Sequence, residues 1–229
     1  IDKKVFPGAV VLIGDGNKIQ FFKAYGTTKY QDPGSVPVKT DFIFDIASVT
    51  KVFTTTVALQ LIDRKVFSLT TKVCEVIEEL NDDSRKNITV WNLLTHSSGL
   101  SFKFRPFFHS YSDFPSKHIR RVILESRPTY ETGSKVLYDN INMMLLAEFI
   151  SRITGKKYID VLRDNVLKPL VLNQTTYKPG RKLIEKIVPT EECGWRMRLG
   201  HGEVHDESAF ALGGIAGHAG LFSTALDLW

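Results

Sequence analysis

The order of apolar and polar residues predicts paired strands at the start of the chain. Residues 9–13 and 19–22 are rich in apolar side chains, and the sequence Gly-Asp-Gly-Asn occupies positions 14–17 between them. Gly and Asn adopt the positive φ angles of tight turns at little energetic cost. This part of the chain therefore predicts a β-hairpin.

Apolar residues recur at helical spacing in three later segments. The first covers residues 48–64 without an internal Gly or Pro, so the serine at its start is expected to open a helix. The second covers about residues 141–153 and has Gly155 as an end signal. The third ends at Leu167, just before Pro169.

The segments between these helices differ in composition. Residues 92–94 predict a short helix that the small polar residues and glycine of positions 95–100 stop. Residues 102–115 are aromatic and aperiodic, which predicts a long covering loop. Residues 209–220 are glycine-rich and apolar, which favours a close-packed loop over a linker. A hairpin, helices and then an irregular segment predict an α+β fold with helices beside an antiparallel sheet.

Composition narrows the possible partners. The 229 residues are 43% hydrophobic, enough for one sizeable core. The net charge is +5, but the basic residues are scattered apart from the pairs at 120–121 and 156–157, so we expect no nucleic-acid partner. No apolar run approaches the roughly 18 residues of a membrane span. Cys74 and Cys193 stand alone without metal-binding spacing, and whether they pair stays open.

A serine and a lysine stand one helical turn apart at the start of the first predicted helix. Ser48 and Lys51 therefore share a face of that helix. A lysine in a dry pocket can be neutral enough to take the serine proton, which turns the hydroxyl into a nucleophile. The backbone N–H of Ser48 can face a developing oxyanion, because helix N-termini leave such groups unpaired. The alternative is a helix-capping serine with a solvated lysine.

A second group of polar residues precedes the helix at 141–153. Tyr138 can return a proton to a leaving group, and the Asn140 amide can hold both a substrate carbonyl and the lysine. The alternative is a half-buried aromatic residue followed by a helix cap. Asp139 adds a carboxylate that can disfavour an anionic substrate.

The order of these motifs resembles the family of class C-type serine β-lactamases, penicillin-binding DD-peptidases and related esterases. The resemblance rests on residues 6–11, 44–51, 93–100, 138–140 and 168–170. It implies a β-lactamase/transpeptidase-like fold, an antiparallel sheet flanked by helices with a helical lobe, and no metal or cofactor. It also implies that Ser48 is the nucleophile, Lys51 and Tyr138 transfer protons, and Asn140 orients the substrate.

The last part of the chain resembles a subgroup linked to peptidoglycan turnover. The similar segment runs from residue 204 to residue 224 and includes His205 and Asp206. These two side chains can contact substrate or fix the loop through hydrogen bonds. The subgroup includes an amidase that cuts between muramic acid and its peptide.

One family element has no match in the chain. The family carries Lys-Thr-Gly or His-Thr-Gly on an edge strand, and residues 218–220, His-Ala-Gly, are the nearest sequence. We do not assign them that role, because Ser223-Thr224 before Asp227 predicts a helix cap and direct passage into a helix. The chain is thus expected to lack the family's C-terminal strands, and a missing segment or a second chain is expected to complete the sheet.

These observations predict one hydrolase domain over residues 1–229. Strands are expected up to residue 47, a mainly helical lobe over 48–200, and a return toward the sheet over 201–229. The expected reaction forms an acyl-enzyme on an amide, lactam or ester of a small molecule or peptidoglycan fragment. A catalytically silent sensor of β-lactams or wall fragments, and a muramoyl-peptide amidase, are the alternatives. A wall-related substrate favours the cell envelope or a secreted location.

Overall fold

The computed structural model describes residues 1, 3–30, 32–101, 116–194 and 196–229, so the expected loop at 102–115 lies outside the described residues. The strands are β1 (Gly8–Asp15), β2 (Lys18–Gly26), β3 (Phe44–Asp45), β4 (Thr176–Tyr177), β5 (Glu192–Cys193), β6 (Arg198–Leu199) and β7 (Leu221–Ser223). The helices are α1 (Thr50–Asp63), α2 (Val90–Leu94), α3 (Ser116–Glu125), α4 (Asn140–Thr154), α5 (Tyr158–Leu162), α6 (Glu207–Ala211) and α7 (Ala225–Leu228). Single 3-10 turns cover 47–49, 73–75 and 78–80, a longer one covers 181–186, and a π-helical turn covers 163–167.

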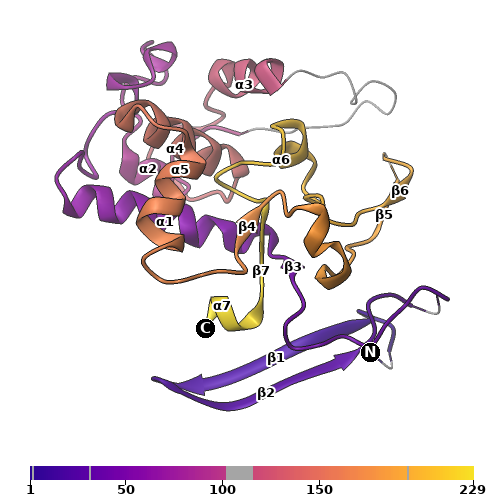
Figure 1. Cartoon of the computed structure of the whole chain (residues 1–229). Coiled ribbons are helices and arrows are strands. Elements are labelled where there is room, and N and C mark those ends of the chain that lie inside the picture. The colour runs from indigo at the N-terminus through magenta and orange to yellow at the C-terminus, as the bar shows by residue number, and fades with distance from the viewer. Residues whose placement is uncertain (2, 31, 102–115, 195) are drawn as a thin grey trace.

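The predicted hairpin is confirmed. β1 and β2 pair antiparallel from Gly8 opposite Gly26 to Asp15 opposite Lys18. Neither strand has a buried residue, and in Figure 1 the hairpin lies below the helices, with α7 close to β1. On one face Val10 and Ala24 pack against a small cluster of Val38, Phe42 and Val188.

A second sheet lies close to the start of α1. β7 is its central strand and pairs antiparallel with β3 on one side and β4 on the other. Direct passage from residues 218–220 into a helix was therefore incorrect, because β7 comes first. The predicted cap is confirmed, since the Thr224 hydroxyl accepts a hydrogen bond of 3.1 Å from the Asp227 N–H at the start of α7.

The predicted long helices are confirmed as α1, α4 and α5 with its π-helical continuation. Ser48 itself lies in the 3-10 turn that leads into α1, and Val49 stands at the cap position of α1. At the other helix Asp139 is the cap, because its carboxylate accepts the Ile141 N–H at 3.0 Å. Both capping alternatives, for Ser48 and for Asn140, are therefore wrong.

The main core lies between the helices. α4 runs through its middle and buries most of its side chains, which stabilise the fold by roughly 1.5–3 kcal/mol for each large apolar residue. The largest fully buried side chains are Phe149, Phe222, Ile43, Ile77, Leu80, Ile88, Leu93, Leu100, Ile119, Ile141, Leu145 and Leu146. None of the described helices is long and apolar enough to cross a bilayer.

Most of the segment at 209–220 is packed tightly, as predicted, although its first residues belong to α6. Gly217 lies directly against α4, where a β-carbon would come within 2.3 Å of the Met143 carbonyl oxygen. Only glycine allows this approach, which brings the following residue, His218, within reach of Lys51. Cys74 and Cys193 are both free thiols, so the open question of their pairing is answered against a disulfide.

Candidate active site

The candidate nucleophile lies on a constrained turn. The residue before Ser48, Ala47, has a φ of 43°, which is uncommon for a residue other than glycine. The Asp45 carboxylate holds this turn by accepting the Ala47 N–H at 2.8 Å. Such backbone strain persists where surrounding contacts impose it, and it often marks functional sites. The turn leaves Ser48 exposed at the surface.

Lys51 is the buried member of the site. Its side chain begins in the first turn of α1, and the residue is only 7% exposed. Its Nζ lies 2.9 Å from the Ser48 Oγ and 3.1 Å from the backbone carbonyl oxygen of His218. The predicted Ser-Lys pair is therefore formed, and the alternative of a solvated lysine is wrong.

Tyr138 reaches the same oxygen from the other side. Its hydroxyl donates to the Ser48 Oγ at 2.9 Å, and its ring centre lies 4.8 Å from the Lys51 Nζ. Burial raises the pKa of the Tyr138 phenol, but hydrogen bonding to Lys51 and Ser48 outweighs it and brings the pKa below its ordinary value. The three side chains that the sequence singled out thus meet at one oxygen atom.

The segment at 93–100 positions Tyr138. The Leu137 N–H donates to the His96 carbonyl at 2.9 Å, and the His96 Nδ1 lies 3.1 Å from the Asp139 carbonyl. The imidazole ring also packs on the Tyr138 ring, with centres 4.7 Å apart. Burial lowers the pKa of His96, so the ring is mainly neutral at pH 7. Sequence reasoning used this segment for a short helix and for the resemblance, and it missed the contact with the tyrosine.

Asn140 lies at the edge of this group. Its Nδ2 points to the Asp206 carboxylate at 3.5 Å, whereas the hydrogen bonds of Lys51 go to Ser48 and His218. The expected contact between Asn140 and the lysine is therefore not formed in this structure. Its predicted role in orienting substrate stays a prediction.

The loop before α6 is fixed by its polar residues. Asp206 accepts the Ala209 N–H at 2.8 Å and lies 2.9 Å from the His218 Nε2, so it has the loop-fixing role. Burial raises the pKa of its carboxyl, but the hydrogen bond and charge of His218 outweigh it and hold the pKa below its usual range. His205 donates its backbone N–H to Asp45 at 2.7 Å, which ties this loop to the nucleophile turn.

Sequence reasoning missed Asp45 as a site residue. Its two carboxylate oxygens join the Ser48 turn to a segment 160 positions later. An Asp two residues before a strained position is the local signal of such a side-chain-to-backbone turn. The contact with His205 has no local signal, because it depends on the fold.

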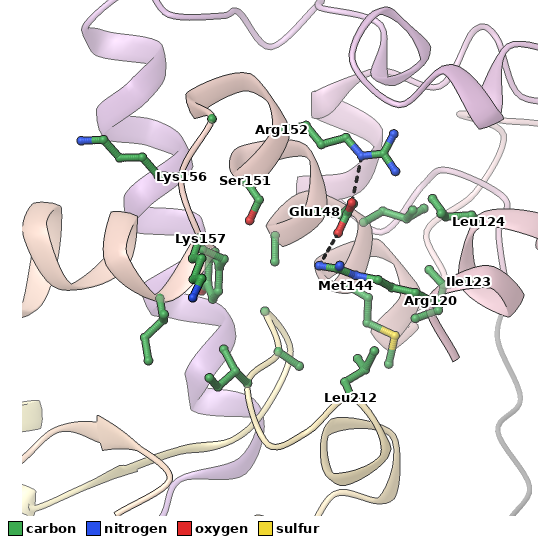
Figure 2. A pocket seen from close by; sticks show the side chains of 18 residues that line it. Arg120, Ile123, Leu124, Met144, Glu148, Ser151, Arg152, Lys156, Lys157 and Leu212 are labelled. Atoms are coloured by element: carbon green, nitrogen blue, oxygen red, sulfur yellow. Dashed lines mark hydrogen bonds and ion pairs between the residues drawn. The ribbon is translucent and has the colours of Figure 1, made fainter. Parts of the chain in front are cut away.

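A cavity of about 630 Å³ lies beside α4, and none of the four predicted site residues lines it. α3, α4, α5 and the segment 212–217 form its walls. Figure 2 shows Glu148 on its wall, bonded to both Arg120 and Arg152. Among the residues that line this cavity, no serine, threonine or cysteine is hydrogen-bonded to a side chain that could act as a base. The candidate chemistry is therefore at Ser48.

The profile of the Beta-lactamase family matches residues 1–229. The chain belongs to the β-lactamase family. It is 31% identical to an N-acetylmuramyl-L-alanine amidase of Bacillus subtilis (strain 168), over 97% of this chain and 57% of the relative. It is 29% identical to a putative D-alanyl-D-alanine carboxypeptidase of Escherichia coli (strain K12), over 97% of this chain and 58% of the relative.

Solved structures of this family share the fold. A class C β-lactamase superposes with a TM-score of 0.79 at 22% identity, covering 99% of this chain and 59% of that one. A β-lactamase/D-alanine carboxypeptidase from Yersinia pestis gives 0.76 at 23%, covering 97% and 61%. The expected β-lactamase/transpeptidase-like α+β fold is confirmed. This chain spans somewhat more than half the length of these relatives.

Proposed function

We propose that Ser48 is the nucleophile of a serine hydrolase that forms an acyl-enzyme. The observation that carries this proposal is the pair of hydrogen bonds at the Ser48 Oγ, from Lys51 and from Tyr138, each 2.9 Å long. A hydroxyl held between two proton-transfer groups and exposed to solvent on one side is the arrangement that covalent acyl transfer needs.

The mechanism begins at the Lys51 amine, which takes the Ser48 proton as the oxygen attacks a carbonyl carbon. The Ser48 N–H stabilises the resulting oxyanion. When the tetrahedral intermediate collapses, its bond to the leaving group breaks, and the proton passes from Lys51 through Tyr138 to that group. Water then attacks the ester carbonyl carbon and gives a proton to Lys51. When the ester bond to Ser48 breaks, Lys51 returns that proton to the Ser48 oxygen, and the acid is released.

For the substrate, we propose an amide bond of a cell-wall peptide. The support is the activity for which the relatives are named, one an N-acetylmuramyl-L-alanine amidase and others putative D-alanyl-D-alanine carboxypeptidases. A muramoyl-peptide amidase is one form of this proposal. A silent sensor would carry the same residues and differ only in failing to hydrolyse its acyl adduct.

Intact-mass measurement of the full natural polypeptide tests the proposal. Incubation with a penicillin and, separately, with an activated phenyl ester should add the acyl mass to the wild type. Ser48→Ala should take up no label, and Ser134→Ala, which removes an exposed serine of the loop before Tyr138, should be labelled normally. Labelling that persists in Ser48→Ala would refute the assignment. Loss of the label with time indicates a hydrolase, and a permanent label indicates the sensor.

A further inference from the structure

Each backbone carbonyl oxygen of residues 216–218 accepts a hydrogen bond from a different side chain. Tyr177, Thr54 and Lys51 donate in turn to the carbonyl oxygens of residues 216, 217 and 218, at 2.7, 2.6 and 3.1 Å. Tyr177, Thr54 and Lys51 are all buried. Buried hydrogen bonds of this kind leave the segment little freedom to shift. The last of these hydrogen bonds, to the His218 carbonyl oxygen, holds the Lys51 amine in place.

The side chain of His218 extends this arrangement to Asp206. The imidazole is fully buried, and its Nε2 lies 2.9 Å from an Asp206 oxygen. A carboxylate only accepts, so the Nε2 carries the proton. Among the residues that the structure describes, the His218 Nδ1 has no hydrogen-bond partner. Asp206 is therefore the polar contact that fixes this ring.

The other carboxylate oxygen of Asp206 faces the side chain of Asn140. It lies 3.5 Å from the Asn140 side chain, and the atom turned toward it must be the amide nitrogen, since two acceptors would repel. The Asn140 carbonyl oxygen is consequently turned away from Asp206. The charge of Asp206 also acts on Lys51 and on Tyr138.

We propose that Asp206, fixed by His218, is a positioning residue of the Ser48–Lys51 site, whose carboxylate orients the Asn140 amide and places a negative charge beside the proton-transfer groups. This inference rests on the function proposed above. Asp206 then has a second role besides capping α6. The cap uses one carboxylate oxygen, and the Asn140 amide contacts the other.

Asp206→Asn separates the two roles. Asparagine has the same size and keeps an oxygen that can accept from Ala209 and His218, so the cap and the loop are retained. The variant loses the charge, and its amide nitrogen faces the Asn140 amide nitrogen. Two donors repel, so the Asn140 side chain must rotate. The matched control is Glu207→Gln, which removes a charge one residue later. The Glu207 side chain has no hydrogen bond or ion pair with a site residue in the part of the chain that the structure describes.

The kinetic test uses the full natural polypeptide and an activated ester. We expect kcat/KM of Asp206→Asn to fall about 10- to 100-fold, as for other small misplacements of reacting groups. The thermal midpoint should fall by only roughly a few degrees, because the hydrogen bond with His218 stays but loses its charge. The alkaline limb of its pH profile should move to lower pH, because the Asp206 charge raises the pKa of Tyr138 and its removal lowers that pKa further. Glu207→Gln should match the wild type. Equal effects of the two variants, or an unmoved limb, would overturn the proposal.

A second measurement does not depend on activity. In protein labelled at the tyrosine 13Cζ, the Tyr138 resonance, assigned with Tyr138→Phe, should titrate at lower pH in Asp206→Asn than in the wild type or in Glu207→Gln. If no probe acylates Ser48 but this shift occurs, the proposed function fails and the placement of the Asp206 charge stands. If Ser48 is acylated and the shift is absent, the proposed function stands and the role of Asp206 is refuted.

Discussion

The two sides of the candidate site are built differently. Lys51 is 7% exposed and bonds to both Ser48 and a carbonyl of the buried segment 216–218. Tyr138 is 60% exposed, and its hydroxyl contacts Ser48 while its ring packs on His96. The buried side therefore fixes the proposed base by packing, whereas the exposed side leaves the proposed proton donor open to solvent. Changes on the buried side should affect stability as well as rate, and changes on the exposed side mainly rate.

The largest effect is expected from Lys51→Met, which keeps the length of the side chain and removes the amine. Acylation of Ser48 should slow by at least about 10³-fold, because the proton acceptor is lost. Stopped-flow acylation by the activated ester measures this rate. Lys156→Met, which removes an exposed amine after α4, should retain the wild-type rate. A rate within tenfold of the wild type in Lys51→Met would mean that another group takes the proton.

Tyr138→Phe should have the next largest effect. Acylation should slow by about 10²-fold, because the donor to Ser48 and the proton relay are removed while the ring contact with His96 stays. The sign of the pH effect follows from the lowered pKa of Tyr138. The hydroxyl donates below that pKa and cannot donate above it, so kcat/KM should fall on the alkaline side at a pH below the usual tyrosine value of about 10. That limb should be absent in Tyr138→Phe, and its survival would assign it to another group.

The smallest effect on rate is expected from Thr54→Val, on the buried side. The variant removes the hydrogen bond to the Gly217 carbonyl and a partner of the Tyr158 hydroxyl. The free energy of unfolding should decrease by about 1–3 kcal/mol, with acylation slowed only a few-fold. Urea unfolding measures the first quantity. Thr56→Val should stay within about 0.5 kcal/mol of the wild type, because the Thr56 hydroxyl donates to the Val52 carbonyl of its own helix at 2.9 Å. Equal losses in the two variants would contradict the special role of the buried segment.

Much of the fold could be predicted because its signals are local. The hairpin and the helices α1 and α4 follow from apolar spacing and from turn residues that act over a few positions. Ser48 and Lys51 were found for the same reason, since one turn of helix brings them together. The division of a single domain at residues 47 and 200 stays a prediction.

The remaining features depend on contacts between distant parts of the chain. The carbonyl oxygen that holds Lys51 belongs to the His218 backbone. Every residue has such a carbonyl, so the residue type cannot show which one makes this contact. The direction of the Asn140 amide depends on Asp206, which is 66 positions later. The three residues of β7 are too few to show a periodic pattern, so the passage from His218 to α7 was misread. In each case the fold, rather than the local sequence, determines the geometry.

The central claim is that the acyl group is transferred to Ser48. The most direct test digests the labelled full natural polypeptide with trypsin and sequences the modified peptide by tandem mass spectrometry. Cleavage after Lys39 and Lys51 releases residues 40–51, which contain Ser48 as their only serine. We expect the added mass on Ser48 of this peptide. An added mass on any other residue, with Ser48 unmodified, would contradict it.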